Sequence, residues 1–92
     1  MLSQADRYKI AQKELSALTS HINIFSSNKD MSYKAVVLAV KSMLSADADN
    51  IPEVIKCIKK RMAQHKLYSD PYEAYERSLN IIRRVYAIPA ND

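Results

Sequence analysis

The sequence predicts an all-α protein: an antiparallel up-down-up-down four-helix bundle in one domain over residues 1–92. Three observations predict this fold class. The chain has no glycine, its residues are mainly helix formers, and four stretches with an apolar period of 3.6 are separated by short polar segments. Hairpin turns, Rossmann turns, phosphate loops and nucleophile elbows all need residues that tolerate positive φ, so the lack of glycine excludes them.

The first helix is expected over about residues 3–25. Ser3, followed three residues later by Asp6, resembles a capping box with aspartate in place of glutamate. The apolar residues that follow form a seam about 100° wide, which is typical of an outer helix in a bundle. These residues are Tyr8, Ala11, Leu15, Leu18, Ile22 and Phe25.

The second helix, about residues 31–46, is expected at the centre of the bundle. Its apolar side chains cover an arc of about 200°, which leaves only a narrow stripe for water. Either Asp30 or Ser32 can supply its N-cap. The arc consists of Tyr33, Ala35, Val36, Val37, Ala39, Val40, Met43, Leu44 and Ala46.

The third helix, about residues 51–66, has an apolar side and a basic side. Asn50 is its expected N-cap, with Pro52 in the first turn. Apolar residues and His65 fall within about 100°, and lysines occupy about 120° opposite them. The basic side consists of Lys56, Lys59, Lys60 and Lys66.

The fourth helix is expected over about residues 71–87, with Asp70 at the N-cap, Pro71 at N1 and Glu73 at N3. Its apolar face covers about 180°, which is wider than one neighbouring helix can bury. Either two helices bury this face, or an edge made of Tyr72, Tyr75 and Tyr86 stays partly open. Arg83 and Arg84 lie in the last turns, where cations suit the helix dipole.

Several classes of function find no support in the residues. His21 and His65 lie on different predicted helices without a ligand at metal-binding spacing, so neither a metal nor a cofactor is expected. Cys57 has no partner base, and no acid and base pair shares a predicted pocket, so the chain is not expected to be an enzyme. The single cysteine and the polar N-terminus favour a cytoplasmic location.

The basic side of the third helix is the best functional candidate. Between Ile51 and Tyr68 five cations stand against the single carboxylate of Glu53, a balance of +4 that equals the net charge of the whole chain. Such a face is either ordinary solvated surface or an electrostatic contact to nucleic acid, acidic lipid or an acidic protein. Sequence-specific DNA reading is disfavoured, because this face lacks the residues that read base edges.

One stretch of the chain resembles a known family. The segments VVLAVKSML, SADADN and IPEVIKCIKKRM, with the capped last helix, are similar in pattern to immunity proteins of pediocin-like bacteriocins over about residues 35–86. The resemblance implies a non-catalytic four-helix protein that protects the producer cell from a pore-forming peptide. It would act at the inner face of the membrane, on a sugar-transporter permease with the bacteriocin bound.

The resemblance also implies that the C-terminal half selects the peptide that is countered. The positions that could serve as partner-binding residues are Lys56, Lys59, Lys60, Lys66, Tyr72, Tyr75, Arg83 and Arg84. The alternative is a small basic module that binds nucleic acid or another phosphate-bearing partner through the lysines of the third helix.

Overall fold

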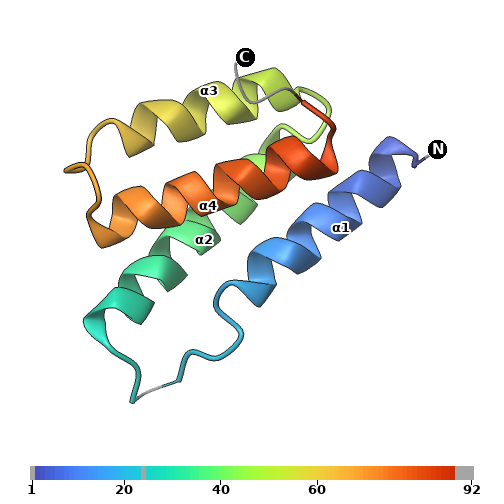
Figure 1. Cartoon of the computed structure of the whole chain (residues 1–92). Helices are drawn as coiled ribbons and strands as arrows, with labels where there is room; N and C mark the ends of the chain where they lie inside the picture. Colours follow the sequence, from blue (N-terminus) through green and yellow to red (C-terminus); the bar gives the residue numbers. More distant parts are fainter. Residues whose placement is uncertain (1, 24, 89–92) are drawn as a thin grey trace.

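The computed structural model describes residues 2–23 and 25–88, and its helices pack against one another as a bundle (Figure 1). The helices are α1 (Gln4–Ala17), α2 (Asn28–Ala46), α3 (Ile51–Met62) and α4 (Asp70–Val85). Successive helices run in opposite directions, and the described residues contain no strand. The predicted all-α four-helix fold is therefore confirmed.

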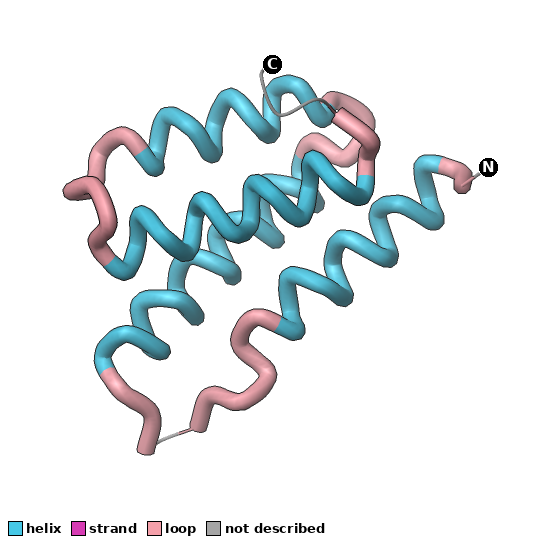
Figure 2. The backbone as a smooth tube through the Cα atoms, viewed as in Figure 1, coloured by secondary structure: helices cyan, strands magenta, loops and turns pink. Residues whose placement is uncertain are grey.

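α2 and α4 form the centre of the bundle. Each of them packs against the three other helices, whereas α1 and α3 make no contact with each other within the described residues. The α1–α2 and α3–α4 connections lie at one end of the molecule and the α2–α3 connection lies at the other (Figure 2). The hairpin of α3 and α4 therefore places its loop far from the α2–α3 connection.

One hydrophobic core joins all four helices. Its fully buried large side chains include Leu15, Leu44, Ile58 and Ile82, one from each helix. Burying a side chain of this size contributes about 1.5–3 kcal/mol to folding, so the core is the main source of stability. The buried arc of α2 is narrower than predicted, because Ala35 and Ala46 are exposed.

Ser3 and Ser27 begin the first two helices. Ser3 forms the predicted capping box: its Oγ accepts from the Asp6 N–H at 3.1 Å, and the Asp6 carboxylate accepts from the Ser3 N–H at 3.4 Å. The prediction of Asp30 or Ser32 as the N-cap of α2 was wrong. Ser27 is the N-cap, because its Oγ accepts from the Asp30 N–H at 3.2 Å and so begins the helix earlier.

α1 ends at Ala17, although its apolar pattern predicted a helix to about residue 25. The hydroxyls of Thr19 and Ser20 donate to the carbonyls of Ser16 and Ala17, which offers the chain an alternative to helical hydrogen bonds. Phe25 is consequently 89% exposed rather than part of the core. Ile24, which falls in the predicted helix, lies outside the described residues.

α3 ends at Met62, four residues before the predicted end. No large apolar residue follows Met62 until Leu67, so a longer helix would gain no core contact to offset the ordering of its backbone. His65 therefore lies in the connection and is exposed, whereas the sequence placed it on the apolar side of the helix. Asn50 occupies the predicted N-cap position, without a hydrogen bond from its side chain.

α4 begins one residue earlier than predicted. Ser69 is the N-cap, and its Oγ accepts from the Tyr72 N–H at 3.4 Å, so Asp70 lies inside the first turn instead of capping it. Three neighbouring helices pack against the wide apolar face of α4 and bury most of it, while its tyrosine edge stays partly open at Tyr72 and Tyr86. Tyr75 is only 5% exposed, while Tyr72 and Tyr86 are half-buried.

Ala87, two residues beyond the end of α4, adopts the left-handed region, with φ 56°. The Ile88 N–H donates to the Arg83 carbonyl at 2.8 Å and the Ala87 N–H donates to the Arg84 carbonyl at 3.3 Å, which is the Schellman pattern. Glycine is the residue that fits this position without a steric cost, and the chain has none.

We therefore expect Ala87→Gly to raise the free energy of unfolding by about 1 kcal/mol, because it removes the left-handed strain of a residue with a Cβ. Urea denaturation measures the change. Ala35→Gly is the control: Ala35 is an exposed alanine inside α2, where glycine should lower stability by about 1 kcal/mol. Equal effects of the two substitutions would contradict the interpretation of the Ala87 conformation.

Candidate functional site

The outward face of α3 and the connection that follows it carry most of the surplus positive charge. We define the basic surface as Lys56, Lys59, Lys60, Arg61 and Lys66. Lys59 is half-buried, and the other four side chains are exposed. The basic surface faces away from the core because the opposite side of α3 is buried. The buried residues of that side are Ile51, Val54, Ile55 and Ile58.

Four of these cations lie on α3, and three of the four also suit the helix dipole. Lys59, Lys60 and Arg61 lie in the last turn of α3, where the helix dipole favours positive charge. Lys66 lies beyond the helix and receives no such benefit. Stabilisation of the helix by its dipole therefore does not account for the positive charge at Lys66.

A polar hollow of about 480 Å³ lies beside the basic surface. It is lined by Cys57, Lys60, Arg61, Gln64, His65 and Tyr75. The rings of His65 and Tyr75 stack, with centroids 5.8 Å apart, which links the connection to α4. The Cys57 thiol donates to the Glu53 carboxylate at 3.7 Å. The two cations give the hollow the chemistry to attract an anionic group.

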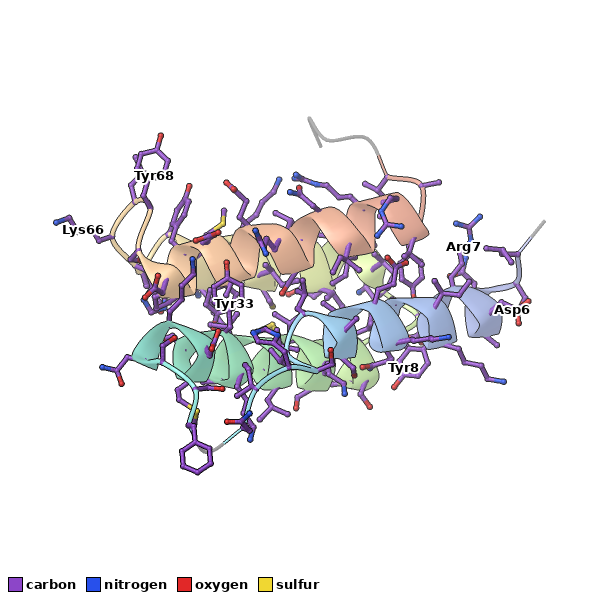
Figure 3. All side chains as sticks on the ribbon, turned by 60° about the horizontal axis from the view of Figure 1, so that its bottom comes forward. Asp6, Arg7, Tyr8, Tyr33, Lys66 and Tyr68 are labelled. Atoms are coloured by element: carbon purple, nitrogen blue, oxygen red, sulfur yellow. The ribbon has the colours of Figure 1, made fainter. Side chains whose placement is uncertain are left out.

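The α3–α4 connection exposes two large side chains next to this charge. Leu67 is 56% exposed and Tyr68 is 85% exposed. Figure 3 shows the side chains of Lys66 and Tyr68 extending outward from the same connection. The sequence pattern did not predict Leu67, Tyr68 or Arg61 as site residues. An apolar pair inside a predicted connection was the available signal for Leu67 and Tyr68.

The structure separates the predicted partner-binding residues into two groups. Lys56, Lys59, Lys60 and Lys66 lie together, and Tyr72 is half-buried near the start of α4. Tyr75 belongs to the core and offers no open edge. Arg83 and Arg84 lie in the last turn of α4, at the opposite end from the α3–α4 connection.

The two arginines have structural surroundings of their own. The Arg84 guanidinium forms an ion pair with Glu14 of α1, and this contact raises the pKa of Arg84. Arg83 is half-buried, and its Nε has no hydrogen-bond partner within the described residues. Arg7 of α1 donates to the Val85 carbonyl, so Arg84 and Arg7 both join α1 to the end of α4. We interpret Arg84 as a contact between helices.

Fold and site define a class: a small all-α protein with four helices whose surplus positive charge lies on the α3–α4 hairpin. Comparison of the chain with protein-family models, with curated proteins and with solved structures gives no match. Within residues 2–23 and 25–88, no group of three or more His, Cys, Asp and Glu side chains could hold a metal ion. In the same residues, no helix has both the length and the apolar character needed to cross a membrane.

Proposed function

We propose that this protein is a non-catalytic protein-binding module of the bacteriocin-immunity type. In this proposal it protects the cell that makes it from a pore-forming peptide, at the cytosolic face of a membrane transporter. The partner is a sugar-transporter permease with the bacteriocin bound. The observation that carries the proposal is the basic surface, which lies in a segment, residues 51–68, whose balance of +4 equals the net charge of the chain.

The geometry supports binding through the α3–α4 hairpin. Lys56, Lys60 and Lys66 are exposed, and a cluster of like charge steers a partner of opposite charge toward it and fixes its orientation. Leu67 and Tyr68 add exposed apolar area beside the charge, as a contact that persists in salt requires. Tyr75, which is buried, acts in this proposal as support for the surface.

A protection assay tests the proposal. The chain is produced in a sensitive strain that carries the permease, and the cells are challenged with a panel of pediocin-like peptides. We expect the inhibitory concentration of at least one peptide to rise. The triple variant Lys56→Gln, Lys60→Gln, Lys66→Gln should lower this protection about tenfold, because each exposed charge contributes about 0.5 kcal/mol to binding.

The matched control removes the same charge elsewhere. Lys9, Lys13 and Lys34 are exposed lysines on α1 and α2, and replacing all three with glutamine should leave protection unchanged. If no peptide of the panel is countered, or if both triple variants lose protection equally, the immunity proposal is wrong.

The same surface also supports a second candidate, a contact to nucleic acid or another phosphate-bearing partner. Binding of this kind depends on counterion release, so it should collapse between about 50 and 200 mM salt. Stacking on bases would rest mainly on the exposed ring of Tyr68, because Tyr75 is buried and Tyr72 is half-buried. This alternative would be favoured if the protein binds RNA or DNA and loses this binding both in high salt and in the triple variant of Lys56, Lys60 and Lys66. The protein should then give no protection against any peptide.

A further inference from the structure

The tip of the α3–α4 hairpin is a turn that projects apolar side chains. We define the hairpin tip as Lys66, Leu67 and Tyr68. The Ser69 N–H donates to the Lys66 carbonyl at 3.0 Å, so Leu67 and Tyr68 occupy the two corners of the turn. Corner side chains point away from the body of the protein, which explains why these two are more than half exposed.

The backbone at the hairpin tip is also unusual. Tyr68 has φ 66°, in the left-handed region that glycine adopts freely and a bulky side chain does not. Ser69, the last residue of the turn, then caps α4, so the strained residue stands directly before the start of the helix. Strained residues persist where the surrounding structure holds them, and they are concentrated at sites of binding. We therefore interpret the exposed ring of Tyr68 as a contact site for a partner.

The hairpin tip holds one cation and follows two others at the end of α3. Lys60 and Arg61 lie in the last turn of α3, and Lys66 belongs to the tip itself. The nearest acidic residue along the chain is Asp70, in the first turn of α4. The tip therefore combines a projecting apolar pair with a surplus of cations.

We propose that the hairpin tip docks this protein onto a bilayer rich in anionic lipid. Leu67 and Tyr68 enter the interfacial region, and Lys60, Arg61 and Lys66 lie against the phosphate headgroups. Tyrosine is favoured at this level of a membrane, and basic residues are attracted by an anionic leaflet. A bilayer fits a convex apolar turn better than nucleic acid does, because bases can stack on Tyr68 and offer nothing to Leu67.

A single tryptophan reports on this contact, because the chain has no tryptophan of its own. Tyr68→Trp is mixed with vesicles of equal parts phosphatidylcholine and phosphatidylglycerol, and separately with vesicles of phosphatidylcholine alone. We expect the emission to shift to the blue with the anionic vesicles and to stay unchanged with the neutral ones.

Phe25→Trp is the matched control. Phe25 is 89% exposed, about as much as Tyr68, which is 85% exposed. It lies in the α1–α2 connection, which has no comparable group of cations in its sequence. Its emission should not shift with either kind of vesicle. An equal shift at both positions would reveal general apolar adsorption and overturn the proposal.

The charges are tested in the Tyr68→Trp background. Lys60→Gln with Lys66→Gln should weaken vesicle binding about 25-fold, because each cation at an anionic surface contributes about a fivefold factor. Lys9→Gln with Lys13→Gln should leave binding unchanged. Three results would each overturn the proposal: no emission shift with anionic vesicles, an equal shift with neutral vesicles, or no effect of replacing Lys60 and Lys66. Binding of RNA by the protein would not rescue the proposal in any of these cases.

The vesicles contain neither permease nor peptide, so lipid docking does not depend on the proposed immunity function. If the protein binds anionic vesicles but does not protect cells from any peptide, the hairpin tip is a membrane contact and the protein has a role other than immunity. Protection without docking would place the protein's contacts on the permease alone. The two proposals therefore fail separately.

Discussion

Replacing Ile82 with alanine is expected to lower the free energy of unfolding by about 3 kcal/mol, within the range of large-to-small changes in a packed core. Ile82 is fully buried on α4, and α4 packs against all three other helices. The cavity left by the missing methyl groups can therefore not be closed by moving one neighbour. The midpoint of thermal unfolding should fall by about 12–24 °C.

Circular dichroism during urea and thermal denaturation measures both quantities. Ile10→Ala is the control, because Ile10 lies on α1 with 36% of its surface exposed and takes no part in the core. We expect Ile10→Ala to change stability by less than about 0.5 kcal/mol. Similar losses for the two variants would mean that α4 is not the centre of the packing.

The apolar periodicity predicted the existence and order of the helices well. The segments around Val36, Ile58 and Ile82 each bury a continuous stripe, so local sequence and tertiary packing favour the same conformation. Helix ends were harder to predict, because they depend on which of several capping residues is used. The sequence predicted Asp70 as the N-cap of α4, and this was wrong because the neighbouring Ser69, which suits the position equally, is the N-cap.

The end of α1 shows a second limit. The apolar pattern continues through Leu18 and Ile22, and both side chains pack against the core although they lie beyond the helix. A connection can place apolar residues on the core without helical geometry. Periodicity therefore predicted the burial of these residues correctly and their backbone conformation incorrectly.

Most of the basic surface could be placed from the sequence because Lys56, Lys59 and Lys60 share the outward face of α3. Contacts between distant segments could not. Arg84 and Glu14 are 70 residues apart in the chain, and their ion pair depends on how α1 lies against α4. The same applies to Tyr75, whose burial depends on the packing around α4 and not on its own spacing.

The second large effect is expected at alkaline pH. Tyr33 on α2 is 5% exposed, and its hydroxyl has no hydrogen-bond partner within the described residues. Burial raises the pKa of Tyr33 to about 12, and the Glu73 carboxylate adds to the increase while Arg77 opposes it. The folded protein therefore favours the neutral phenol more strongly than the unfolded chain does, for which the pKa is about 10.

The sign of the pH dependence follows from this difference. Between pH 10 and about 12 the folded state holds the Tyr33 proton that the unfolded state has lost, so stability falls as the pH rises. The contribution is fully present below pH 10 and decreases by about 1.4 kcal/mol at pH 11 and by about 2.7 kcal/mol well above pH 12.

Urea denaturation of the wild-type protein and of Tyr33→Phe, at pH 8 and at pH 11, isolates this contribution. The wild type should lose about 1.4 kcal/mol more than the variant over this interval, because phenylalanine has no proton to release. At pH 8 the variant should be about as stable as the wild type, since the hydroxyl that it removes is buried and has no hydrogen-bond partner within the described residues. Tyr68→Phe is the control, because it removes an exposed hydroxyl and should lose the same stability as the wild type between pH 8 and pH 11. An equal loss of stability in the wild type and in Tyr33→Phe would contradict a buried, neutral Tyr33 at the α2–α4 contact.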